Sequence, residues 1–443
     1  MKFSRCFLRN NKIIILLIVT GLLLSGCNKK NDAEGGMADS AIHPDITVIP
    51  SKAENSNSVE ESDVVENNVT DEEKASVEKG INNEDKVSEN VNNTEKNDDT
   101  TPNLNINDVT DLATFKEKAA LLFEHKPFQG TVFITKNDEI ILKQAYGYAD
   151  IENKIPNEID TIYEIGSITK QFTAVGIMML VEDGLISVED TLDKYLPEYP
   201  YASQITIKQL MNMTSGIKDY FNDEDYMRRY FGVEKIEDAF NNRISKEIKN
   251  EELLKYISEY ELEFEPGTKY SYSNTNYHFL GMIIEKVSEM SYEEYITANI
   301  LEPLGMSSTS FNPLNTTATG YGQYNGIPRP IMSPHPTISY AAGSICSNVD
   351  DMLMWENAVI AGELLTEKSW SEIFDGGKYG YGYGWGIQVF MYSHSGQTLG
   401  FNSYVNICPK YDFIIIVLSN TLQYSSAEVG KSIMQNFAKY LIN

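Results

Sequence analysis

A sharp change in composition near residue 108 decides which part of this 443-residue chain can fold. From Asn28 to Asp108 there is no Phe, Tyr, Trp or Cys, and residues 31–108 carry 20 acidic against 5 basic side chains, a net charge of −15. Such a segment buries too little apolar surface to offset the entropy lost on ordering, and its like charges extend it. We therefore expect a disordered acidic tether over 28–108 and a folded region over 109–443. Docking of a basic partner is the alternative role for the tether.

The first 27 residues have the features of an export signal. Four basic side chains within the first 12 positions precede a largely apolar run, Ile13–Leu24, which is short for a bilayer span. The run leads into the sequence LSGC, Leu24–Cys27, which resembles the lipobox of bacterial lipoproteins. This resemblance implies that Cys27 is lipidated and that the protein is extracytoplasmic and lipid-anchored to the bacterial membrane. The alternative is an uncleaved apolar stub with an incidental cysteine.

Charge and metal-ligand content narrow the possible partners. The whole chain has a net charge of −28, to which residues 1–30 contribute +6 and residues 31–108 contribute −15, leaving about −19 for the folded region. An acidic region of this kind is a poor partner for nucleic acid. The five histidines lack paired metal-ligand spacing and no phosphate-cradling glycine loop occurs, so we expect no metal and no cofactor. Cys346 and Cys408 could pair or remain buried thiols.

The order of the elements predicts an α/β fold of the α+β kind. A helix over 108–125 and a β-hairpin over 128–150 precede a mainly helical stretch from about 185 to 370. Strand patterns return at 379–390 and in two later runs, before an amphipathic helix over 425–441. We therefore expect one antiparallel sheet built from both ends of the folded region and flanked by helices, with a mainly helical region inserted between its halves.

A serine and a lysine stand three positions apart at the polar front of an apolar helical pattern over 164–184, at Ser167 and Lys170. Three residues is close to one helical turn, so both side chains project from the same face. A helix N-terminus tolerates a developing negative charge, and a lysine removed from water has a lowered pKa and can act as a base. The pair can therefore be a catalytic nucleophile and its base, or only a helix cap followed by a surface lysine.

Two further stretches favour the catalytic interpretation. Tyr272-Ser273-Asn274 lies about a hundred residues downstream, and His394-Ser395-Gly396 lies on or beside a predicted strand. With its S-x-x-K, Y-x-N and H-x-G triplets in this order, the region 109–443 resembles the serine β-lactamase and penicillin-binding protein superfamily, in its class C-like branch. Segments such as FEPGTKYSYSNTNY and AAGSICSNVDDMLMW also look like landmarks of that family. The resemblance implies a β-lactamase/transpeptidase-like fold.

The resemblance also implies a role for each of these residues. Ser167 would be the nucleophile that forms an acyl-enzyme, Lys170 would assist its deprotonation, and Tyr272 would be the general base and later the acid for the leaving group. Asn274 would bind an amide of the substrate, and His394, Ser395 and Gly396 would line the cleft beside the substrate backbone. The oxyanion hole would consist of the backbone N–H groups of Ser167 and Gln397.

The implied protein is a membrane-anchored serine hydrolase acting on D-amino-acid-containing peptides, amides or esters related to the cell wall. One departure bears on the substrate: β-lactamases and D-Ala-D-Ala peptidases of this superfamily usually have lysine where this chain has His394, and a histidine is largely neutral at pH 7. A class C-like β-lactamase and a non-turnover penicillin-binding sensor or receptor are the alternatives. The expected partners are a small-molecule or peptide substrate, possibly derived from peptidoglycan, and the membrane; we expect a monomer.

Overall fold

The computed structural model describes residues 111–124, 128–221, 223, 247–324 and 326–441. The predicted signal sequence, lipobox and tether, residues 1–108, lie outside the described residues and stay predictions. Within the described residues, no helix combines the length and the apolar character that crossing a membrane requires.

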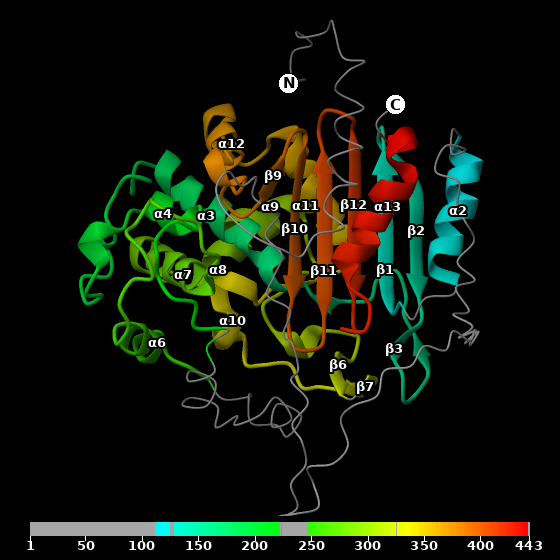
Figure 1. Cartoon of the computed structure of the whole chain (residues 1–443), viewed down its shortest axis with the longest axis horizontal. Helices are drawn as coiled ribbons and strands as arrows, with labels where there is room; N and C mark the ends of the chain where they lie inside the picture. Colours follow the sequence, from blue (N-terminus) through cyan, green and yellow to red (C-terminus); the bar gives the residue numbers. More distant parts are fainter. Residues whose placement is uncertain (1–110, 125–127, 222, 224–246, 325, 442–443) are drawn as a thin grey trace, which may run out of the picture. The chain divides into compact units, whose positions relative to one another are not determined.

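A six-stranded antiparallel sheet joins the two ends of the folded region (Figure 1). Its strand order is β2-β1-β12-β11-β10-β9, so the N-terminal hairpin pairs directly with the last strand of the chain. The predicted α+β fold, with a sheet built from both ends, is therefore confirmed. The strands are β1 (Gly130–Lys136), β2 (Glu139–Tyr146), β9 (Gly386–Gln388), β10 (Met391–Gln397), β11 (Asn402–Cys408) and β12 (Phe413–Ser419).

The central strand β12 is buried on both faces because helices cover both. Ile414 and Ile416 pack into the larger core cluster with the central helices, whereas Ile415 and Val417 pack into a second cluster with residues of the terminal helices. Successive side chains of a strand point to opposite faces, so this alternation marks the two layers. The terminal helices are α2 (Leu112–Glu124) and α13 (Ser426–Leu441), and the opposite layer includes α3 (Thr169–Glu182) and α11 (Val349–Ala361).

The residues between the two halves of the sheet are mainly helical, as predicted. Their helices are α4 (Ile207–Met211), α6 (Asn250–Ile257), α7 (Asn274–Ser288), α8 (Tyr292–Ile296), α9 (Glu302–Leu304), α10 (Pro336–Gly343) and α12 (Glu367–Ile373). Short strands form three small two-stranded sheets: β3 (Tyr148–Asp150) with β4 (Ile155–Pro156), β5 (Tyr163–Glu164) with β8 (Cys346–Ser347), and β6 (Tyr321–Tyr324) with β7 (Ile327–Pro330).

The structure corrects one predicted strand and shows the state of the two cysteines. The predicted strand over 379–390 is a strand only at β9; the preceding residues form a loop, in which Gly384 has a φ of +86° and a Cβ would lie 2.9 Å from the Lys170 carbonyl oxygen. The glycines thus allow this loop to approach α3 closely rather than extend a sheet. Cys346 and Cys408 are both buried free thiols.

Candidate active site

Ser167 lies in a single 3₁₀ turn, η3 (Gly166–Ile168), which leads directly into α3. Gly166 has a φ of +51°, and a Cβ at this position would lie 2.6 Å from the backbone nitrogen of Gln397. Only glycine satisfies both conditions without strain. The turn is therefore pressed against the end of β10, which brings the backbone N–H of Gln397 next to the serine. Both Ser167 and Lys170 are buried.

The amino group of Lys170 lies at the centre of the site. Its Nζ is 2.9 Å from Ser167 Oγ, 2.8 Å from Asn274 Oδ1 and 2.8 Å from the Ala342 carbonyl oxygen. Burial lowers the pKa of Lys170 to about 7, against the opposing charge of Asp219. A neutral amine has two hydrogens and one lone pair, and the amide and carbonyl oxygens can only accept. The lone pair of the neutral lysine is therefore directed at Ser167 Oγ, where it can take the hydroxyl proton.

The Ala342 carbonyl is available to the lysine because α10 is broken at Tyr340, whose φ of +39° and ψ of −135° are not helical, and only a short turn, Ala341–Gly343, follows the break. Carbonyl groups in the last turn of a helix have no partner within the helix. Ala341 O accepts a hydrogen bond from Thr173 Oγ1 at 2.7 Å in the same way. The end of α10 is thus fixed to the first turns of α3, and it holds the protonated form of Lys170 as well as the neutral one.

Tyr272 covers the other side of the lysine, with Lys170 Nζ 4.9 Å from the centre of its ring. Burial raises the pKa of the Tyr272 hydroxyl well above its ordinary value, and the Ser167 hydroxyl opposes this shift only in part. The phenol therefore keeps its proton at neutral pH in the free protein. These opposite shifts favour Lys170, rather than a Tyr272 phenolate, as the group that first takes the serine proton.

Asn274 is the first residue of α7, and its side-chain oxygen faces Lys170. The backbone N–H of Asn274 donates to Asp219 Oδ1 at 2.9 Å, and its side-chain nitrogen donates to Asp219 Oδ2 at 3.4 Å. Asp219 is a site residue that the sequence analysis missed. No motif marks it, because it comes from a separate loop 55 residues before Asn274 in the chain.

The third triplet lies on β10, and its histidine belongs to the wall of the site. His394 is 7% exposed; its Nδ1 lies 2.6 Å from the Ser395 carbonyl and its Nε2 lies 3.0 Å from the Tyr381 hydroxyl. A carbonyl only accepts, so Nδ1 carries a proton and donates to Ser395, while Nε2 shares a hydrogen bond with the Tyr381 hydroxyl. His394 is thus held by Tyr381, beside the Tyr272 ring at 6.2 Å between centres.

The remaining residues of the triplet leave one edge of β10 open. β9 pairs only with Met391–Ser393, so among the described residues no strand covers the β9 side of Ser395–Gln397. A Cβ at Gly396 would lie 1.9 Å from the carbonyl oxygen of Ile165, so this position too requires close approach to the segment before Ser167. Contacts thus bring together most of the predicted site residues, namely Ser167, Lys170, Tyr272, Asn274, His394, Gly396 and Gln397, whereas Cys27 lies outside the described residues.

A β-lactamase family model matches residues 122–436 of the chain. The chain belongs to the β-lactamase family. The family consists of serine hydrolases, and the predicted relationship to the serine β-lactamase and penicillin-binding protein superfamily is confirmed. The assignment to a class C-like branch stays a prediction.

Individual relatives are similar to parts of this chain. Penicillin-binding protein 4* of Bacillus subtilis (strain 168) is 38% identical over 188 residues, 42% of this chain and 39% of that protein. Protein flp of Staphylococcus aureus (strain COL) is 30% identical over 309 residues, 66% of this chain and 59% of that protein. The chain thus spans less than two thirds of the length of these relatives. The octameric penicillin-binding protein homologue from Pyrococcus abyssi has a similar structure, with a TM-score of 0.60 and 28% identity over 75% of this chain and 77% of that chain.

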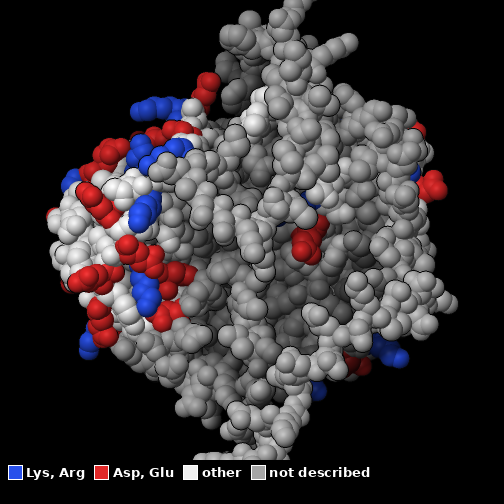
Figure 2. All heavy atoms as spheres, in the orientation of Figure 1, with Lys and Arg blue, Asp and Glu red and all other residues white. Residues whose placement is uncertain are grey.

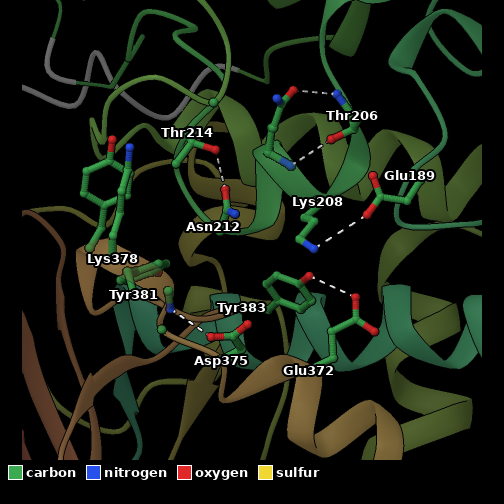
Figure 3. A pocket seen from close by; sticks show the side chains of 15 residues that line it. Glu189, Thr206, Lys208, Asn212, Thr214, Glu372, Asp375, Lys378, Tyr381 and Tyr383 are labelled. Carbon is green, nitrogen blue, oxygen red and sulfur yellow. Dashed lines mark hydrogen bonds and ion pairs between the residues drawn. The ribbon is translucent and has the colours of Figure 1, made fainter.

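In this member of the β-lactamase family, a hollow of about 380 Å³ lies beside the loop before β9 (Figure 3). Tyr381, which holds His394, also lines the hollow, so one side chain separates the two. The other lining side chains are polar: Lys208 pairs with Glu189 at 3.6 Å, and Tyr383 donates to Glu372 at 3.2 Å. Tyr379, Tyr381 and Tyr383, from the loop before β9, thus line one side of this hollow.

The described surface carries both signs of charge. Figure 2 shows acidic side chains interspersed with basic ones on the side where α4 and α6 lie in Figure 1. Within the described residues no three His, Cys, Asp or Glu side chains converge in a group that could hold a metal ion.

Proposed function

We propose that this protein is a hydrolase that forms an acyl-enzyme on Ser167, with D-amino-acid-containing peptides, amides or esters related to the cell wall as substrates. The single observation that carries this proposal is the placement of Lys170, buried, with its pKa lowered to about 7 and its nitrogen 2.9 Å from Ser167 Oγ. A structural lysine has no need of this environment, whereas a general base near neutral pH does.

The geometry supports the following sequence of steps. Neutral Lys170 takes the proton of Ser167, whose oxygen attacks the substrate carbonyl carbon. The negative charge that develops on the carbonyl oxygen is stabilised by the backbone N–H groups of Ser167 and Gln397. Tyr272, which lies beside both groups and is protonated, passes a proton to the leaving group and is reprotonated from Lys170. A water molecule then attacks the acyl-enzyme. The same groups take a proton from the water and return one to Ser167 Oγ, which restores the free serine.

The open edge of β10 supports an extended substrate. A peptide backbone can pair with Ser395–Gln397 where β9 ends, which places its carbonyl between the two N–H donors. His394 is held by Tyr381, and a histidine lacks the permanent positive charge that a lysine at this position would offer a substrate carboxylate. This favours turnover of amide, ester or peptide substrates over rapid turnover of β-lactam antibiotics. The names of two relatives, a penicillin-binding protein and a penicillin-binding protein homologue, support a site that penicillin can acylate.

We also propose that the hydrolase works outside the cytoplasm, anchored through a lipidated Cys27. The support is the LSGC sequence after an apolar run and the acidic segment 28–108, which would hold the folded region away from the membrane. Metabolic labelling with a radioactive fatty acid tests this proposal. The wild type should incorporate label and Cys27→Ala should not, and equal incorporation by both would contradict it.

The intact mass of the full chain after incubation with benzylpenicillin tests the acyl-enzyme. The wild type should gain one penicilloyl group and Ser167→Ala none. Ser347→Ala, which alters an equally buried serine bonded to Thr309, is the control and should be acylated normally. Hydrolysis of D-alanyl amides and esters by the wild type is measured in parallel. Turnover that depends on Ser167 would support the proposal.

Three other results would each lead to a different conclusion about the activity of this protein. Rapid hydrolysis of nitrocefin would identify a β-lactamase. A stable adduct with no turnover of any amide, ester or peptide would identify a penicillin-binding sensor or receptor. Turnover by Ser167→Ala equal to that of the wild type would refute the acyl-enzyme altogether.

A further inference from the structure

The loop that carries Asp219 is bonded to the first turn of α7 at three points. The Asn274 backbone N–H donates to Asp219 Oδ1 at 2.9 Å, Thr275 Oγ1 donates to the Lys218 carbonyl at 2.6 Å, and the Tyr220 N–H donates to Thr275 Oγ1 at 3.1 Å. Ser273, at the N-cap position, makes no capping hydrogen bond with its own side chain. The carboxylate of Asp219 thus supplies the cap from outside, where negative charge is favourable.

The same carboxylate decides which way the Asn274 amide points. Its Oδ2 lies 3.4 Å from Asn274 Nδ2, while Asn274 Oδ1 lies 2.8 Å from Lys170 Nζ. Rotating the amide by half a turn would set its oxygen against the carboxylate and its NH₂ group against the lysine. The contact between the two oxygens would then be repulsive, and the NH₂ group would face a donor whenever Lys170 is protonated, so Asp219 selects the orientation in which Asn274 accepts a hydrogen bond from Lys170.

We propose that Asp219 is a positioning residue for catalysis: by capping α7 and orienting the Asn274 amide, it directs the Lys170 lone pair at Ser167. This inference rests on the proposed function, because it assigns Lys170 the role of base. Without Asp219, Asn274 is free to turn its NH₂ group toward Lys170. The lysine lone pair could then accept that donor instead of the serine proton.

Asp219 also affects the protonation of Lys170 through its charge. Its carboxylate raises the pKa of Lys170, in opposition to burial. The other titratable groups that face the lysine are the phenols of Tyr272 and Tyr277, whose rings lie 4.9 and 5.7 Å from Nζ. Burial raises the pKa of both phenols well above the ordinary value, so both are neutral in the working pH range. Removing the charge of Asp219 should therefore lower the pKa of Lys170 further.

The test measures how fast a fluorophosphonate probe labels Ser167 in the full chain, as a function of pH from 5 to 9. Asp219→Asn keeps an oxygen that can cap α7 but loses the charge, whereas Asp219→Ala loses both. Asp351→Asn is the matched control. Like Asp219, Asp351 accepts a backbone N–H from another segment, that of Ser308 at 2.8 Å, but it has no contact with Asn274 or Lys170 among the hydrogen bonds described.

We expect the labelling rate of the wild type to rise with pH through a midpoint near 7, because the neutral lysine is the reactive form. In Asp219→Asn the midpoint should move down by about one pH unit. In Asp219→Ala the plateau rate should also fall about tenfold, because Asn274 loses its orientation. Asp351→Asn should keep the wild-type midpoint even if it unfolds more easily, since loss of folded protein lowers the rate at every pH equally.

An unchanged midpoint in Asp219→Asn, together with a wild-type plateau in Asp219→Ala, would overturn the inference and leave the proposed function intact. If the wild type itself is not labelled, or is labelled equally after Ser167→Ala, the proposed function fails and the inference fails with it.

Discussion

Replacing Lys170 by methionine tests the burial of this lysine and its role as base in one variant. In the unfolded chain a lysine keeps its proton up to about pH 10.5, whereas the buried Lys170 releases it near pH 7. Between these two values the unfolded state binds more protons than the folded state, so the stability of the wild type rises with pH. Methionine has a similar length and does not titrate, so the variant lacks this contribution.

The size of the effect follows from the shift in pKa. Relative to a lysine of ordinary pKa, the shift lowers the free energy of unfolding by about 4 kcal/mol at pH 7 and by about 2 kcal/mol at pH 9. The wild type should therefore gain about 2 kcal/mol relative to Lys170→Met between pH 7 and pH 9. The hydrogen bonds to Asn274 and the Ala342 carbonyl are also lost in the variant, but that loss enters the comparison at both pH values.

Urea denaturation of both proteins at pH 7, 8 and 9 measures this difference, with Lys255→Met as the control because Lys255 is exposed on α6. The control should follow the wild type at every pH. Fluorophosphonate labelling of Lys170→Met should be lost over the whole range. A difference in unfolding free energy that stays constant from pH 7 to pH 9 would show that Lys170 does not titrate there, and the neutral lysine would have to be abandoned as the base.

Two further substitutions test other parts of the structure. Glu356 on α11 is fully buried, neither of its carboxyl oxygens has a hydrogen-bond partner among the described residues, and burial raises its pKa to about 8. Because the unfolded state releases this proton near pH 4.5, the wild type loses stability as the pH rises from 4.5 to 8. Glu356→Met should therefore raise the free energy of unfolding measured in urea, only slightly at pH 5 and by about 3 kcal/mol at pH 7. An increase that does not depend on pH would contradict this prediction. Gly166→Ala would place a Cβ 2.6 Å from the Gln397 nitrogen and displace one oxyanion donor, so kcat should fall about 10²–10³-fold. The control is Gly184→Ala, whose Cβ meets no atom within 4 Å and which should keep the wild-type kcat. A wild-type kcat in Gly166→Ala would exclude Gln397 as that donor.

The sequence determined the fold class of this protein and predicted its reacting groups. The boundary near residue 108, the hairpin at the start of the folded region and the apolar runs at its end are local features of composition and periodicity, and they are enough to predict a sheet formed from both ends. The S-x-x-K spacing likewise places Ser167 and Lys170 on one face, because it depends only on the geometry of a helical turn. The three triplets, in order, indicated the family.

Other properties arise only when distant segments meet. The tyrosine and glycine pattern at 379–390 resembles one long strand, but in the structure only Gly386–Gln388 form a strand. The residues before it form a loop because their glycines allow a close approach to α3, and this loop brings Tyr381 to His394. Asp219 carries no motif, and its contact with Asn274 depends on packing of a loop against α7.

The pKa of Lys170 is likewise a tertiary property. It is set by removal of water around one ammonium group and by the charge of Asp219, and both result from how α3, α7, α10 and the Asp219 loop pack together. The sequence thus supplied the chemical groups, and the packing of distant segments decided their protonation and orientation. The physical reason is that the electrostatic field and the solvation at a point depend on all the atoms around it, whichever part of the chain they come from.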